Sequence, residues 1–149
     1  MNALIEQFNG YFHALRRLGG SEFYGWAFVI EVESNVRESL LNHLSDCDLE
    51  QEVLEEKVID YAGVQVLLDE YIFSKLQITD EDTLGLLKWD IVEYYGLASL
   101  ELDIDADFNP LVRKGAIQFT MCPSSHESHV YYVIPISNYA IVTGLAICA

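Results

Sequence analysis

The sequence predicts an α+β fold in which a block of helices packs on one face of an antiparallel β-meander sheet of about five strands. Apolar residues first recur at the helical spacing, and towards the C-terminus they fall into β-branched and aromatic runs. Short connections between those last runs favour antiparallel neighbours. A chain of 149 residues is expected to form one domain, so residues 1–149 are interpreted as a single acidic globular domain.

The first two thirds of the chain are predicted to be mostly helical. Leu4, Phe8, Phe12 and Leu15 share one face of a helix over residues 2–18, which ends at two glycines. The aromatic run 23–32 is predicted to be a strand, and a helix follows to about residue 44. Further helices are expected from residue 48 to the glycine at 63, from 64 to 76, and from 80 to 95, where another glycine ends the helix.

The last third changes to the period of a β-strand. Leu100, Leu102 and Ile104 alternate with acidic residues, which predicts a strand with one buried and one acidic face. Residues 115–122, 130–136 and 139–148 are predicted to form three more strands. With 23–32, these complete a sheet of five strands.

The net charge is concentrated in one stretch of the chain. Residues 46–107 hold 18 acidic side chains and 3 lysines, so they carry −15 of the net charge of −16. We expect these acids to form one surface patch. Such a patch repels nucleic-acid backbones and anionic membranes, because both require Lys and Arg. It attracts a basic protein surface and accelerates the encounter with it.

The cysteines and the start of the chain favour a cytoplasmic protein. Cys47, Cys122 and Cys148 are odd in number and lack the short spacings of a disulfide framework, so a reducing compartment is expected. The first residues lack the basic segment of a signal peptide. The longest apolar stretch, 139–149, is about half of what a membrane helix needs.

Two clusters could bind a cation. Asp103, Asp105 and Asp107 would lie on one face of an extended strand and present three carboxylates to Mg²⁺, Mn²⁺ or Ca²⁺. Cys122, His126 and His129 could supply three of the four ligands of Zn²⁺, or a Cys–His nucleophilic pair. The alternative without a cation is a solvated strand face for the three aspartates and a polar hairpin loop for the Cys–His set. We predict no metal and no cofactor, and we find no phosphate-binding loop or catalytic triad motif.

The function predicted from these observations is that of a non-enzymatic binding protein. We expect an acidic inhibitor of the immunity or antitoxin type, which neutralises a basic partner such as a toxin nuclease. Its partner-binding residues are predicted to be acids that steer the partner and aromatic side chains that anchor it if they are exposed. These are Glu50, Glu52, Glu55, Glu56, Asp60, Asp69, Glu70, Asp80, Glu81, Asp82, Trp89, Asp90, Tyr94 and Tyr95.

Two alternative functions belong to other classes of protein. An inhibitor that imitates DNA would have the same charge, with carboxylates spaced like phosphates on an elongated surface. A small metal-dependent enzyme would use the Asp103, Asp105 and Asp107 cluster or the Cys122, His126 and His129 set, and would hold stoichiometric metal.

Overall fold

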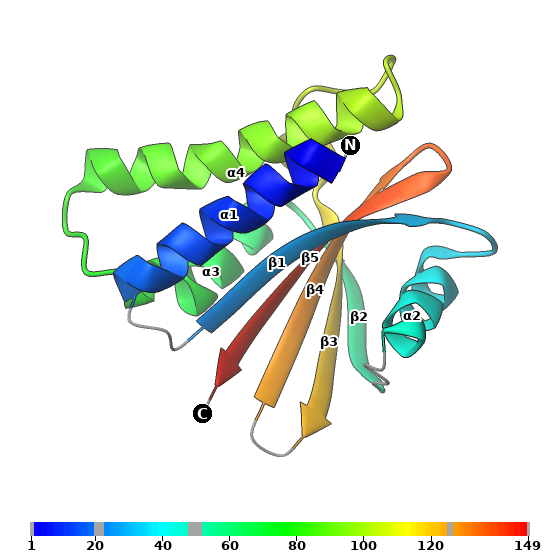
Figure 1. Cartoon of the computed structure of the whole chain (residues 1–149), viewed down its shortest axis with the longest axis horizontal. Coiled ribbons are helices and arrows are strands. Elements are labelled where there is room, and N and C mark those ends of the chain that lie inside the picture. The colour runs from blue at the N-terminus through cyan, green and yellow to red at the C-terminus, as the bar shows by residue number, and fades with distance from the viewer. Residues whose placement is uncertain (1, 20–22, 48–51, 125–126, 149) are drawn as a thin grey trace.

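Five strands form one antiparallel sheet in the computed structural model, which describes residues 2–19, 23–47, 52–124 and 127–148 (Figure 1). The strands are β1 (Phe23–Glu31), β2 (Val53–Ile59), β3 (Ala116–Ser124), β4 (Glu127–Ile136) and β5 (Tyr139–Cys148). Their order across the sheet is β1-β5-β4-β3-β2, so β3, β4 and β5 form a meander and β1 and β2 form the two edges. The predicted α+β class is confirmed.

Four helices and a short 3₁₀ helix contribute to the layer on one face of the sheet. The α-helices are α1 (Asn2–Gly19), α3 (Tyr61–Tyr71), α4 (Glu81–Leu102) and α5 (Pro110–Lys114), and the 3₁₀ helix is η1 (Phe73–Lys75). All of them contribute buried side chains to one core with the sheet. The remaining helix, α2 (Val36–Asp46), packs on the opposite face.

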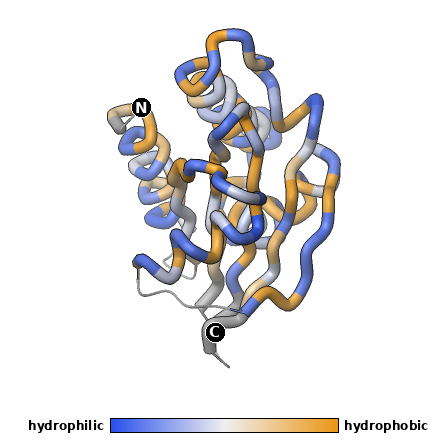
Figure 2. Tube along the Cα trace, turned by 90° about the vertical axis from the view of Figure 1, so that its right-hand side faces the viewer, coloured by the Kyte–Doolittle hydropathy of each residue, from blue (hydrophilic) through white to orange (hydrophobic). Residues whose placement is uncertain are grey.

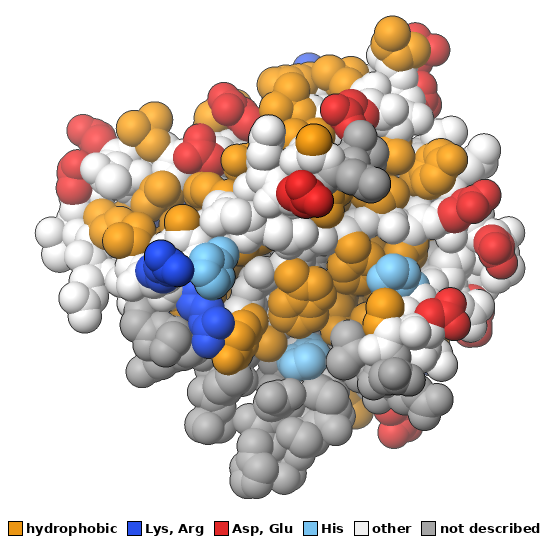
Figure 3. Space-filling model, viewed as in Figure 1, with side chains coloured by type: hydrophobic (Ala, Val, Ile, Leu, Met, Phe, Trp, Pro, Cys, Tyr) orange, Lys and Arg blue, Asp and Glu red, His pale blue; other side chains and the backbone are white. Residues whose placement is uncertain are grey.

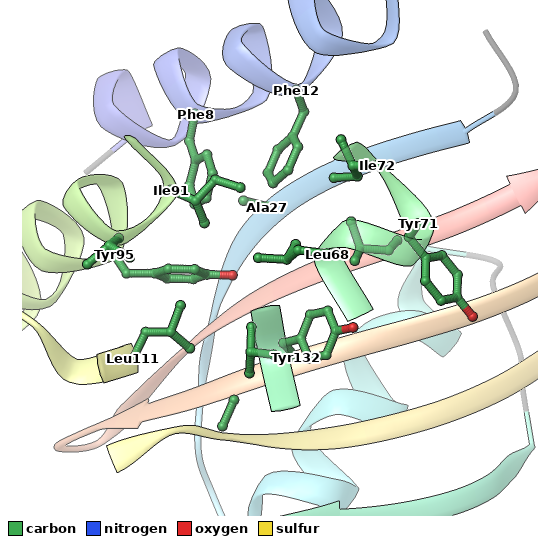
Figure 4. Packing of buried hydrophobic residues seen from close by; sticks show 14 of the residues in the cluster. Phe8, Phe12, Ala27, Leu68, Tyr71, Ile72, Ile91, Tyr95, Leu111 and Tyr132 are labelled. Carbon is green, nitrogen blue, oxygen red and sulfur yellow. The ribbon is translucent and has the colours of Figure 1, made fainter. Parts of the chain in front are cut away.

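Aromatic side chains dominate the core beneath the helical layer. Figure 4 shows Phe8 and Phe12 of α1 pointing down towards Tyr95 of α4, Leu68 of α3 and the strands. The rings of Phe8 and Phe12 are stacked with centroids 4.8 Å apart, and Phe8 meets Tyr95 edge to face at 5.4 Å. Buried aromatic pairs of this kind add to the stabilisation that their buried area gives.

A second core lies between the other sheet face and α2. Leu40 and Leu44 of α2 are buried against Phe119, Tyr131 and other side chains of β3, β4 and β5. Neighbouring residues of β4 therefore belong to different cores, because side chains of a strand alternate between the two faces. Both faces of this sheet are apolar, and both are covered by helix.

The prediction of a helix over residues 48–63 is wrong, because residues 53–59 form β2. This segment pairs with β3 from Val53↔Met121 to Ile59↔Ala116. Without it, the outer backbone groups of β3 would lack hydrogen-bond partners. The chain turns into α3 directly afterwards, where the Asp60 carboxylate accepts a hydrogen bond from the Gly63 amide at 2.9 Å. The few apolar residues of this segment fit either a helix or a strand, and pairing with β3 favours the strand.

The predicted strand at residues 100–104 is also wrong, because α4 continues to Leu102. Gly96 lies inside the helix and does not end it. A Cβ atom at this position would lie 2.0 Å from the backbone oxygen of Phe108. The glycine is thus required by the close approach of the chain after α4, a reason that only the folded structure reveals.

One buried hydrogen bond links the longest helix to the centre of the sheet. The hydroxyl of Tyr95 on α4 bonds that of Thr143 on β5, and both residues are buried. Burial raises the pKa of Tyr95. Because either hydroxyl would be costly to bury alone, the pair fixes the position of α4 over β5.

Hydrophobic and hydrophilic residues are mixed along the chain (Figure 2). Among the described residues, no helix has both the length and the apolar character that crossing a membrane requires.

Two glycines of α4 should respond in opposite ways to the same substitution. We expect Gly96→Ala to lower the free energy of unfolding by about 1–3 kcal/mol, since its Cβ would collide with backbone. A Cβ added at Gly85 would have no heavy atom within 4 Å apart from the backbone of its own helix. Gly85→Ala should therefore raise the free energy of unfolding by up to about 1 kcal/mol. Urea unfolding followed by circular dichroism measures both. Equal effects would contradict the close approach at Gly96.

The pair Tyr95 and Thr143 can be tested by a double-mutant cycle. Tyr95→Phe leaves the Thr143 hydroxyl buried without its partner, so we expect a loss of about 1–3 kcal/mol of unfolding free energy. Thr143→Val in the same background should recover part of this loss, because it removes the orphaned group. Strict additivity of the two substitutions would show that the hydroxyls do not interact.

Candidate protein-binding surface

The acidic residues do not form the single patch that the sequence predicts. Glu56 on β2 lies 3.9 Å from Arg37 of α2, which places it on the α2 face of the sheet. The carboxylates of α4 belong to the helical layer on the opposite face. Figure 3 likewise shows the acidic side chains of one face as separate groups among uncharged ones. The charge is therefore distributed around the molecule.

Several predicted partner-binding acids have roles within the fold. Asp60 caps α3, and Asp80 caps α4, where the Thr83 hydroxyl donates to it at 2.6 Å. That hydrogen bond is the main cause that lowers the pKa of Asp80. Asp69 bonds Lys88 at 2.7 Å, an ion pair between α3 and α4. These carboxylates are partly satisfied already, which leaves less of their charge for a partner.

The remaining predicted acids lie in several places. Glu55 is 3.4 Å from Lys57 of the same strand. Glu52, Glu70 and Glu81 are exposed just before β2, near the end of α3 and in the first turn of α4. Glu50 lies outside the described residues.

One side of α4 carries exposed apolar residues interleaved with acids, and we call it the α4 outer face. Leu86, Trp89 and Leu97 are 69%, 43% and 45% exposed. At 100° per residue they fall on one stripe of the helix together with Asp82, Asp90 and Glu93. Figure 3 shows hydrophobic and acidic groups in alternation along the upper margin, where α4 runs.

The α4 outer face is unusual because the opposite side of the helix is apolar as well. Ile91, Val92 and Tyr95 are buried in the helical layer. A helix of a soluble domain normally turns a polar face to water, and one that is apolar all round is normally buried. The α4 outer face therefore exposes apolar side chains as well as the acidic ones that a surface helix normally presents.

A groove beside the α4 outer face separates α4 from α1. It has a volume of about 290 Å³ and is lined by Gln7 of α1 and by Asp90, Glu93, Tyr94 and Leu97 of α4. The Tyr94 ring forms its wall and is held in place by stacking on Phe8, with centroids 4.8 Å apart and planes inclined by 7°. The groove is thus bounded by a fixed aromatic ring and two carboxylates.

The two carboxylates repel each other. Partial burial raises the pKa of Asp90, and the charge of Glu93 raises it further. Burial also raises the pKa of the neighbouring Tyr11, with contributions from Asp90 and Tyr94. The Tyr11 hydroxyl donates to the backbone oxygen of Leu87. A Lys or Arg side chain placed in the groove would relieve this repulsion, so cation binding should lower the pKa of Asp90.

Four of the predicted partner-binding residues lie on the α4 outer face or in its groove, namely Asp82, Trp89, Asp90 and Tyr94. Tyr95 does not meet the condition set for an anchor, because it is 2% exposed. The sequence analysis missed Leu86, Glu93 and Leu97. A helical projection of residues 80–95 already places Leu86 and Glu93 on this stripe, and its continuation past Gly96 adds Leu97.

Asp103, Asp105 and Asp107, which are all described, do not gather into a cation site. Asp103, Asp105 and Asp107 lie in a turn after α4, where the Asp103 carboxylate accepts from the Asp105 amide at 3.0 Å. Asp107 instead faces Arg113 and Lys114 at 4.0 and 3.9 Å. No group of three or more metal-ligating side chains occurs among the residues that were placed.

The Cys122, His126 and His129 set is only partly described. His129 is nearly buried on β4, with its ring 5.7 Å from that of Trp26. His126 and the side chain of Cys122 lie outside the described residues.

In comparisons with known proteins, no family model matches this chain and no curated protein matches it significantly.

Proposed function

We propose that this chain is a small acidic binding protein that captures a basic protein on the α4 outer face. One observation carries the proposal: Leu86, Trp89 and Leu97 remain exposed on a helix whose inner side is already buried in the core. Isolated exposed apolar residues need no explanation. Three on one helical stripe, interspersed with three acids, are typical of a helix whose face binds another protein.

The composition of the α4 outer face suits an interface with a basic partner. Trp89 is of the residue type most often found at binding hot spots. Asp82, Asp90 and Glu93 surround it with negative charge, and the net charge of −16 extends this attraction into solution. Apolar contact would supply most of the affinity, whereas the acids would accelerate the encounter and select against acidic partners.

The class of partner follows from the amount of charge. Proteins that bind nucleic acid concentrate Lys and Arg in a cleft or on a face, and a toxin nuclease is one such protein. A compact acidic domain that covers this cleft would prevent substrate binding. We therefore propose inhibition of the immunity or antitoxin type, without catalysis by this chain.

The arrangement of the carboxylates favours a protein-like interface over DNA mimicry. Acidic residues of β2 and α4 lie on opposite sides of the sheet. The acids of α4 are interrupted by Leu86, Trp89 and Leu97, whereas a phosphate backbone offers a continuous line of charge. Competition between the partner's DNA and this chain would still occur where the two sites overlap.

The anchors can be tested with the partner recovered from an extract of the source organism on the tagged chain. We expect Trp89→Ala and Leu97→Ala each to weaken binding at least about fivefold, mainly through faster dissociation. Biolayer interferometry gives both rate constants. Val58→Ala on β2 is the matched control, since Val58 is 78% exposed but lies at the far edge of the sheet.

The acids provide a second readout on the same partner. Asp82→Asn with Glu93→Asn should slow association and flatten its dependence on salt, with little change in dissociation. Loss of affinity in the Val58 control, or unchanged binding in both α4 anchor variants, would contradict the proposal. Thermal melts of each variant separate loss of binding from loss of fold.

A further inference from the structure

The outer edge of β1 divides into a capped part and an open part. The Asn9 side chain of α1 accepts from the Ala27 amide at 2.6 Å and donates to the Ala27 carbonyl at 3.0 Å. It therefore satisfies the backbone of an edge strand as a neighbouring strand would. Edge strands are commonly protected in such ways against unwanted pairing.

The backbone of β1 beyond Ala27 has no such cap. Groups that point to the same side of a strand recur every second residue. Since those of Ala27 point outwards, the amides and carbonyls of Val29 and Glu31 do so too. The Val32 amide confirms this parity, because it bonds the Asn138 carbonyl on the β5 side at 2.8 Å. Within the described chain, no hydrogen bond is formed by the outer groups of Val29 and Glu31.

A groove of about 470 Å³ runs along this open edge, between β1 and α2. Its β1 side is formed by Val29, Ile30 and Glu31, and its α2 side includes Asn42 and Asp46. An extended segment paired with β1 would direct every second side chain into this space.

The groove is fixed in shape by contacts between β1 and α2. The Phe28 and His43 rings are stacked with centroids 4.5 Å apart. The buried Ser39 hydroxyl accepts from the Glu33 amide at 3.1 Å, which holds the turn into α2. A peptide would therefore meet a preformed site, which reduces the entropic cost of binding.

The charge of the groove determines what can occupy it. Glu31, Glu33 and Asp46 line it, and no Lys or Arg belongs to the described lining. A second copy of the chain is disfavoured, because it would bring the same acidic edge and groove against this one. A segment with Lys or Arg at alternate positions would be complementary.

We propose that the open edge of β1 from Val29 to Glu31, with the groove beside α2, binds an extended basic segment of a partner protein as an added β-strand. This site is separate from the α4 outer face, and the inference does not depend on the function proposed for that face. Main-chain hydrogen bonds to Val29 and Glu31 would give affinity, while Glu33 and Asp46 would select basic side chains.

Amide hydrogen exchange measured by NMR on the full chain tests the proposal. In the free protein, the amides of Val29 and Glu31 should exchange faster than those of Phe28 and Ile30, which pair with β5. The probe is a soluble peptide of about eight residues that alternates Lys with Val or Thr. At saturation it should slow exchange at Val29 and Glu31 at least about tenfold.

Four controls make the test specific. The same peptide with its alternate backbone amides N-methylated should bind at least about tenfold more weakly, because it cannot complete the ladder. The double variant Glu33→Lys with Asp46→Lys should lose a similar factor of affinity. Glu6→Lys with Asp105→Lys changes the net charge equally on exposed residues that do not line the groove, and should retain binding. Trp89→Ala should retain it as well, which separates this site from the α4 outer face.

Four results would overturn the proposal. They are slow exchange at Val29 and Glu31 in the free protein, peptide protection confined to other residues, equal binding of the N-methylated peptide, and protection that rises with protein concentration in the absence of peptide. The last result would assign the edge to a second copy of the chain.

Discussion

Both faces of the five-stranded sheet are apolar, and the need to cover both of them organises the rest of the molecule. Along β4, Val130, Tyr132 and Ile134 enter one core, while Tyr131 and Val133 enter the other. The helical layer that includes α1, α3 and α4 covers the first face, and α2 covers the second. The acids are consequently displaced to the perimeter, because a carboxylate buried without a partner would be very costly. An acidic chain can thus enclose a large core, and its charge spreads around the surface instead of forming one patch.

The helical layer explains why α4 has two different apolar sides. Its inner side covers the sheet through Ile91, Val92 and Tyr95, and the Tyr95–Thr143 hydrogen bond fixes its position. Nothing within the described fold requires Leu86, Trp89 or Leu97 on the other side. Their presence between carboxylates is accounted for by a partner that is both apolar and basic. The open edge of β1 adds a second, chemically different surface, in which backbone groups and not side chains are unsatisfied.

The sequence was most informative where the spacing of apolar residues fits only a helix or only a strand. Phe8, Phe12 and Leu15 mark α1 at the helical period, and the three C-terminal strands follow from their apolar runs and short connections. The number of strands was right although one was misplaced, since β2 took the place of the strand expected at residues 100–104. Val53 to Ile59 is exposed on most of its residues, so its pairing depends on the free edge of β3 and not on its own pattern. Gly96 was misleading for the same reason. It suggested the end of a helix, but a glycine is needed there because the backbone of Phe108 approaches α4 closely. The α4 outer face and its groove could therefore be predicted only in part. Asp82, Trp89, Asp90 and Tyr94 were among the predicted residues, whereas Leu86 and Glu93 were overlooked inside the predicted helix and Leu97 lay beyond its predicted end.

If the α4 outer face contacts a basic protein, site-specific photo-cross-linking from this face will capture that protein. A photoreactive amino acid would replace Leu97 in one sample and Val58 of β2 in another, and both proteins would be irradiated in an extract of the source organism. The account predicts that the Leu97 position cross-links to one basic protein, that the yield falls as salt is raised, and that the Val58 position gives no such product. Cross-linking of the same protein from Val58 alone, or of an acidic protein from Leu97, would contradict the account.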